Sequence, residues 1–162
     1  MTTLSRRTLV HCPVGQAPRH LATFFRAHGS PDGDVAKLDL RVEAKVPGLP
    51  APLSLSHPVV ATLQYDAHPA DMRPRFRVQW VPTGNDPVPS FAGSLVVDSD
   101  EDYSTFFLVL EGHYEPPFGL AGQAFDAVVG HRIAEATADD LLARIRAFVE
   151  QAYRDEEAGK PA

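Results

Sequence analysis

Residues 106–119 read FFLVLEGHYEPPFG, and this stretch decides the fold. It opens with five consecutive apolar residues, which are typical of a buried β-strand. A proline pair then ends the strand, because proline lacks the N–H group that a strand ladder requires. The stretch therefore predicts a strand that ends at the proline pair, with a different element after residue 119. The residues that shape this junction are Gly112, Tyr114, Pro116, Pro117 and Gly119.

Behind the proline pair, apolar residues recur at spacings of three and four, which predicts a long amphipathic helix. About 36 helical residues would span roughly 54 Å. That exceeds the diameter of about 40 Å expected for a compact domain of this length. Thr137-Ala138-Asp139-Asp140 resembles a capping box, so we expect a bend or break between Gly130 and Thr137. The apolar stripe consists of Leu120, Ala124, Val128, Ala138, Leu141, Ile145, Phe148 and Ala152.

Upstream of residue 106, apolar and polar residues alternate, which is typical of antiparallel strands with one buried face. Turn-forming Pro, Gly, Asn and Asp residues separate these runs. The sequence thus predicts an α+β protein with an antiparallel sheet of about six strands and a long C-terminal helix. We expect strands at 5–11, 35–45, 55–65, 75–80, 91–97 and 103–112, and one short helix at 18–27.

The chain has 162 residues, enough for one domain. We expect this domain at 1–155 and a polar tail at 156–162. The net charge of −6 disfavours nucleic acid as a partner, because such binding relies on lysine and arginine. Cys12 is the single cysteine, the N-terminus lacks the apolar run of a signal peptide, and no apolar run is long enough to span a bilayer. These features predict a cytoplasmic protein.

The order strand, helix, five antiparallel strands and long helix resembles the helix-grip fold of the START-like superfamily, also called SRPBCC. Residues 112–119 are similar to the G-x-Y-x-P-P-x-G junction of its bacterial members, which include polyketide cyclases. The resemblance implies a curved sheet wrapped around the long helix, with an apolar cavity between them. Relatives bind lipids, sterols, quinones, polyketides or plant hormones, and a minority catalyse cyclisation, dehydration or hydrolysis. Many relatives have two helices after the first strand, whereas this sequence predicts one.

Residues on the apolar faces of the predicted strands are candidates to line such a cavity. A polar side chain there needs a hydrogen-bond partner, which a ligand or the core itself would supply. An aromatic side chain there offers a large flat surface to a ligand, or simply fills the core. The candidates are His57, Tyr65, Phe76, Trp80, Phe91 and Leu108.

Glu111 and His113 share one face of the last predicted strand. We place them outward as an ion pair, because the opposite face carries Phe106, Leu108 and Leu110. With the opposite parity they would form an acid–base pair. His11, Cys12, His20 and His28 match no zinc spacing, so we expect neither a metal nor a cofactor.

Three functions remain open. The first is the binding of a hydrophobic small molecule, such as a lipid, a quinone or a polyketide-like compound, between sheet and helix. The second is a cyclase or dehydratase in which His57 and Tyr65 act as acid–base groups in the same cavity. The third is a non-catalytic interaction module, for example a homodimer. We favour binding over catalysis because no catalytic motif is present.

Overall fold

The computed structural model describes residues 2–29, 35–41, 58–66, 73–82, 90–115 and 131–160. Within these ranges the chain forms six strands, two α-helices and one short 3-10 turn. The strands are β1 (Thr2–Val10), β2 (Val35–Arg41), β3 (Pro58–Asp66), β4 (Arg75–Pro82), β5 (Ser90–Ser99) and β6 (Phe106–Glu115). The helical elements are η1 (Val14–Gln16), α1 (Ala17–His28) and α3 (His131–Ala158).

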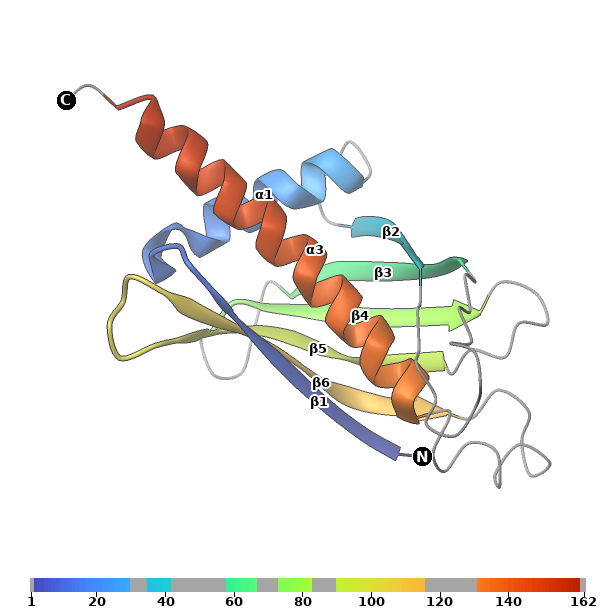
Figure 1. The fold of residues 1–162 in the computed structure, drawn as a ribbon. Helices are drawn as coiled ribbons and strands as arrows, with labels where there is room; N and C mark the ends of the chain where they lie inside the picture. Colours follow the sequence, from blue (N-terminus) through green and yellow to red (C-terminus); the bar gives the residue numbers. More distant parts are fainter. Residues whose placement is uncertain are drawn as a thin grey trace, which may run out of the picture.

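The strands form one antiparallel sheet in the order β1-β6-β5-β4-β3-β2. Strands β2 to β6 follow one another as a meander, and β1 closes the other edge beside β6. Figure 1 shows α3 crossing one face of this sheet diagonally, with α1 beside its C-terminal part. An α+β fold with an antiparallel sheet and a C-terminal helix is confirmed, and the arrangement is consistent with a helix-grip fold.

The core lies between α3 and the sheet face that α3 covers, which we call the inner face. On β6 every second residue up to Leu110 is buried, because alternate side chains of a strand point to opposite faces. On α3 the buried residues recur at spacings of three and four, and they face the sheet. The large apolar side chains that α3 buries in this core are Ile133, Leu141, Leu142, Ile145 and Val149.

Helix α3 is continuous from His131 to Ala158, a length of roughly 42 Å. We expected a bend or break between Gly130 and Thr137. The prediction of a break is wrong for the residues after Gly130, which form one helix. The Thr137 hydroxyl does not cap a new helix. It lies inside the helix, where it donates a hydrogen bond of 2.8 Å to the carbonyl oxygen of Ile133. Residues 116–130, including the apolar Leu120, Ala124 and Val128, lie outside the described residues.

The C-terminal part of α3 projects beyond the sheet and packs against α1 instead (Figure 1). Phe24 of α1 meets Phe148 of α3 edge to face, with ring centroids 5.3 Å apart. Further along, Arg19 forms an ion pair with Glu156. Helix α3 thus extends through Glu156 and Glu157, where a polar tail was expected. Between β1 and β2, the part of the chain that the structure describes contains one α-helix and the turn η1.

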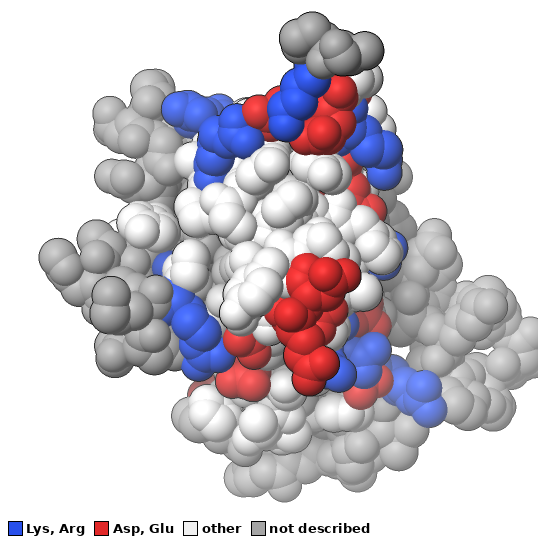
Figure 2. All heavy atoms as spheres, turned by 90° about the vertical axis from the view of Figure 1, so that its left-hand side faces the viewer, with Lys and Arg blue, Asp and Glu red and all other residues white. Residues whose placement is uncertain are grey.

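Charged side chains of both signs are interspersed around the end of the molecule that lies at the left of Figure 1 (Figure 2). The turn between β5 and β6 contributes three of the acidic residues at this end. Asp100 organises that turn, because its carboxylate accepts hydrogen bonds from the Glu101 backbone and the Thr105 hydroxyl.

No helix within the described ranges is long and apolar enough to cross a membrane.

Candidate functional site

An aromatic row crosses the inner face of the sheet near the N-terminal end of α3. Tyr114 on β6 lies opposite Phe91 on β5, and Phe91 lies opposite Trp80 on β4. The rings of Trp80 and Phe91 are stacked, with centroids 4.2 Å apart and planes 17° from parallel. All three residues are buried. We call Trp80, Phe91 and Tyr114 the aromatic row.

Two glycines make room for this row. Gly93 and Gly112 lie opposite each other, two residue pairs along from Phe91 and Tyr114 and on the same face of the sheet. A Cβ atom at either position would lie 2.7 Å from Cζ of the Phe91 ring and would also overlap backbone atoms of the neighbouring strand. The Phe91 ring therefore lies over the glycine pair. Gly112 was predicted to allow a close approach of the backbone, and the approach it allows is to a second strand and an aromatic ring.

A hydrogen-bond chain begins at the β6 end of the aromatic row. The Tyr114 hydroxyl lies 3.0 Å from Nδ1 of His131, and Nε2 of His131 lies 3.1 Å from the Glu135 carboxylate. A carboxylate only accepts hydrogen bonds, so Nε2 carries a proton. In the neutral imidazole, Nδ1 then accepts a hydrogen bond from the Tyr114 hydroxyl. Tyr114 is buried, whereas the His131 side chain is 42% exposed, so the chain connects the interior with solvent.

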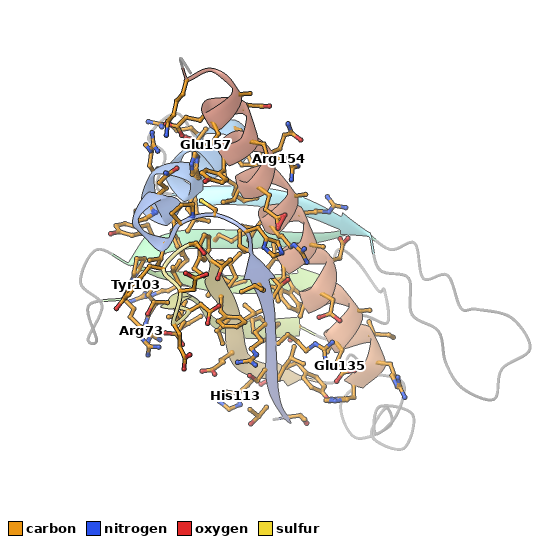
Figure 3. All side chains as sticks on the ribbon, turned by 60° about the vertical axis from the view of Figure 1, so that its left-hand side comes forward. Arg73, Tyr103, His113, Glu135, Arg154 and Glu157 are labelled. Carbon is orange, nitrogen blue, oxygen red and sulfur yellow. The ribbon has the colours of Figure 1, made fainter. Side chains whose placement is uncertain are left out.

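Arg6 of β1 holds the outer end of this chain. Its guanidinium lies 3.6 Å from Glu135 and forms two hydrogen bonds with Asp139, of 2.7 and 2.8 Å. The hydrogen bond from Arg6 to Asp139 raises the pKa of Arg6, so the guanidinium stays charged. Glu135 and Asp139 follow His131 at spacings of four along α3, which places all three on one side of the helix. Figure 3 shows Glu135 near the N-terminal end of α3.

Sequence reasoning missed His131, Glu135, Asp139 and Arg6 as members of a site. The spacing of His131, Glu135 and Asp139 was visible in the sequence as a row of titratable side chains on one side of the predicted helix. The sequence did not reveal that Tyr114 contacts His131, because this contact joins the end of a strand to the start of a helix.

The predicted cavity residues fall into separate places. Phe76 and Tyr65 form a second aromatic group, roughly 13 Å from the aromatic row along β4. Phe76 stacks on Phe25 of α1, with ring centroids 4.8 Å apart, and Tyr65 contacts Phe76 with ring centroids 5.4 Å apart. Tyr65 is 49% exposed although it follows the inner-face parity. Leu108 is buried still further from the aromatic row, opposite Val97.

Four other predicted residues lie outside the described residues: His57, Pro116, Pro117 and Gly119.

Glu111 and His113 point outward, as predicted, and both are exposed. Figure 3 shows His113 away from α3, on the other side of the sheet edge. No ion pair joins Glu111 to His113 within the described ranges, so the predicted pairing is not observed there. Ala92 lies beside His113 on the outer face, where the two residues help to line a hollow of about 330 Å³.

The histidines near Cys12 have structural partners. His20 is buried, with Nε2 3.2 Å from the Gln16 amide oxygen and 3.5 Å from the Glu156 carboxylate. Burial lowers the pKa of His20, and burial raises the pKa of the Cys12 thiol to about 11. Within the described part of the chain, no group of three or more His, Cys, Asp and Glu side chains is placed to hold a metal ion.

A larger hollow of about 540 Å³ opens at the surface between β1 and α3. Charged side chains dominate its lining: Arg146 donates to Glu150 at 2.8 Å, and Arg6 pairs with Asp139. Since most of the lining side chains are charged, we do not assign a hydrophobic ligand to this hollow. The aromatic row with its hydrogen-bond chain remains the candidate site.

The fold and the site define an α+β protein with an aromatic inner sheet face under a long helix. Among solved structures, a conserved protein from Geobacillus kaustophilus is similar in fold, with 12% identity, a TM-score of 0.52, and 94% of this chain and 97% of that chain covered. The ZhuI aromatase/cyclase from Streptomyces sp. R1128 matches with 15% identity, a TM-score of 0.49 and 99% of each chain covered.

An uncharacterized protein from Bacillus thuringiensis matches with 13% identity and a TM-score of 0.49, over 91% of this chain and 99% of that chain. No protein-family model and no curated protein matches the sequence. At these identities the likeness concerns the fold alone.

Proposed function

We propose that this protein binds a hydrophobic small molecule between the sheet and α3, at the aromatic row. The observation that carries the proposal is the row itself: three large rings from three neighbouring strands, directly opposite one another, with a hydrogen-bonding chain at one end. Flat aromatic surfaces bind apolar molecules, and a few placed polar groups orient them. The ligand class is a lipid, a quinone or a polyketide-like compound.

The choice of the aromatic row over the Phe76 group follows from packing. Phe76 already stacks on Phe25 of α1, and Phe24 seals the same region against Phe148. At the aromatic row, Trp80 stacks on Phe91, a neighbour from the sheet itself. The aromatic row also combines rings from three neighbouring strands with the polar contact between Tyr114 and His131 at one end, which supports it as the binding site.

The first test is native mass spectrometry of the protein purified from its own organism. We expect a retained hydrophobic molecule that is released on denaturation. Trp80 is the single tryptophan of the chain, so its fluorescence reports occupancy of the site. Titration with 1-anilinonaphthalene-8-sulfonate should change the Trp80 emission and saturate at one equivalent. A protein that retains no molecule and shows no saturable change would contradict the proposal.

Acid–base catalysis in the same place is the second candidate function. The observation that favours it is the contact between Tyr114 and His131, which joins a buried hydroxyl to a proton acceptor. In this candidate function, Tyr114 and His131 take the acid–base roles that the sequence predicted for His57 and Tyr65. A suitable probe is 4-hydroxy-4-phenylbutan-2-one, which loses water to form an enone that absorbs in the ultraviolet. Turnover that disappears in His131→Gln would support this role, and no turnover by the unaltered protein would remove it.

A further inference from the structure

We infer that the hollow between β1 and α3 binds an extended acidic segment of another protein, which adds to the free edge of β1 as a further strand. This hollow, which we call the edge groove, is lined by residues 6–8 of β1 and by one side of α3 between Asp139 and Arg154. It shares no residue with the aromatic row, so the inference stands apart from the proposed function.

The first step is the position of the groove on the strand. Among the described residues, β1 pairs with β6 and forms one edge of the sheet. An edge strand directs the N–H and C=O groups of alternate residues away from its neighbour, where another chain can pair with them. Arg6, Arg7 and Thr8 all line the groove, although consecutive side chains of a strand point to opposite faces. The groove therefore runs along the backbone edge of β1.

Two contacts show that β1 and α3 lie side by side along this groove. The Arg6 guanidinium binds the Asp139 carboxylate, and the His11 backbone N–H donates to Glu150 at 3.4 Å. From Arg6 to His11 the strand rises about 17 Å, and from Asp139 to Glu150 the helix also rises about 17 Å. An extended segment of about five residues covers the same distance. The groove thus has the length that a short added strand requires.

Small side chains keep the α3 side of the groove open. Ala143 and Ala147 lie one helical turn apart on the side of α3 that lines the groove, and both are exposed. The buried Leu142 lies beside them and gives this side an apolar base. A segment that pairs with β1 can therefore approach α3 here without meeting a large side chain.

The groove is positively charged, although the chain as a whole has a net charge of −6. Four arginines and two acidic residues line it. Arg6 is paired with Asp139, and Arg146 is paired with Glu150, so these four charges offset one another. The two arginines that remain favour a partner with acidic side chains.

These two arginines are Arg7 and Arg154, and both are exposed. Arg154 donates to the neutral amide oxygen of Gln151 at 3.0 Å, and the Arg7 guanidinium lies 4.7 Å from the centre of the Phe107 ring. Neither contact neutralises a guanidinium. The same charges disfavour a second copy of this chain as the partner. Pairing of β1 with β1 would bring the arginines of both strands together, and like charges opposite each other destabilise a strand pair.

The experiment uses the complete protein and a fluorescein-labelled seven-residue peptide in which valine alternates with glutamate. We expect saturable binding of one peptide per chain by fluorescence anisotropy, and slower hydrogen exchange of the β1 amides in the complex. The same peptide with lysine in place of glutamate should not bind. Methylation of alternate peptide nitrogens removes the N–H donors from one edge of the peptide. Of the two alternating patterns, one should abolish binding and the other should preserve it.

Two variants test the groove itself. Arg154→Gln removes one of the unbalanced charges and should weaken binding of the glutamate peptide about fivefold. Ala147→Glu places a carboxylate inside the groove and should weaken binding about tenfold. Matched controls are Arg132→Gln, on α3 outside the groove, and Ala22→Glu, at an exposed position of α1. Both controls should bind the peptide as the unaltered protein does.

Several results would overturn the inference. Equal binding of the glutamate and lysine peptides would show that charge does not select the partner, and no binding of either up to about 1 mM would remove the site. Equal effects of the two methylation patterns would exclude strand addition, which uses one edge of the peptide. A dimer in light scattering that Ala147→Glu dissociates would assign the groove to a second copy of the chain. Circular dichroism and thermal melting establish that each variant is folded before binding is compared.

Discussion

The Tyr114 hydroxyl lies 3.0 Å from Nδ1 of His131, which joins the last strand to the first residue of the last helix. The contact spans 17 positions of sequence. It holds the start of α3 against the end of the aromatic row, so it stabilises the fold and shapes the candidate site at once.

Replacing Tyr114 by phenylalanine should lower the free energy of unfolding by about 1 kcal/mol, because the variant loses the hydrogen bond to His131 and keeps its ring in the core. Urea denaturation followed by Trp80 fluorescence measures this difference. Tyr103→Phe is the matched control, since Tyr103 is 71% exposed. Equal losses in the two variants, or no loss in Tyr114→Phe, would show that the hydrogen bond adds nothing to stability.

The second prediction concerns the glycine pair beneath Phe91. In Gly93→Ala the new methyl group would meet the Phe91 ring and the backbone of β6. A ring can tilt, but a paired strand cannot withdraw without breaking its ladder. We therefore expect a loss of about 3 kcal/mol, together with a change in the Trp80 emission as the stacked Phe91 moves.

Gly15→Ala provides the comparison. No heavy atom lies within 4 Å of the position that its Cβ would occupy. Alanine restricts the unfolded chain more than glycine does, so this variant should be unchanged or slightly more stable, by up to about 1 kcal/mol. A Gly93→Ala protein as stable as Gly15→Ala would mean that the sheet accommodates the methyl group.

The strands could be predicted from the sequence because burial on one face imposes a period of two. Phe76, Val78 and Trp80 are buried, while Arg77 and Gln79 between them are exposed. The same parity placed Glu111 and His113 outward. The alternation pattern predicts the face of the sheet on which a side chain lies, but it does not predict how close that residue is to the end of the sheet. Tyr65 has the inner-face parity of Leu63 yet is half exposed.

The candidate site was harder to predict because it depends on contacts between distant residues. Neither Tyr114 nor His131 is unusual within its own element. Only the packing of α3 against the edge of the sheet brings them together, and Arg6 joins them from the other end of the chain. The expected break near Thr137 failed for a related reason. A threonine followed by acidic residues resembles a helix start, but the hydroxyl found its acceptor within the helix.

A third prediction concerns acid stability. Glu150 is buried, and although burial alone would raise its pKa, hydrogen bonds from Arg146 and from the His11 backbone lower it. The folded state therefore holds this proton less tightly than the unfolded state, whose glutamate pKa is about 4.3. The resulting stabilisation is present above that value and is lost as the pH falls through the lower pKa of the folded state.

The measurement is the free energy of unfolding of Glu150→Gln between pH 7 and pH 3. We expect the variant to be less stable than the unaltered protein by about 1 kcal/mol at pH 6, and the difference to shrink as the pH falls toward 3. Glu111→Gln, at an exposed position of the outer face, is the control. A difference that stays constant over this range would assign the effect to packing rather than to charge.

The last prediction concerns Cys12. Its side chain is fully buried, and this burial raises the pKa of the thiol to about 11. Only the thiolate reacts, so at pH 7 roughly one molecule in ten thousand is chemically competent, and the reagent must also reach the sulfur. We expect no reaction of the folded protein with 5,5′-dithiobis(2-nitrobenzoic acid) over several minutes, and one equivalent in guanidinium chloride. In Gly93→Ala the reaction should accelerate, because labelling then follows the population of opened molecules. A folded protein that reacts as fast as a small thiol would place Cys12 at the surface and would contradict the packing of α3 against β1 and α1.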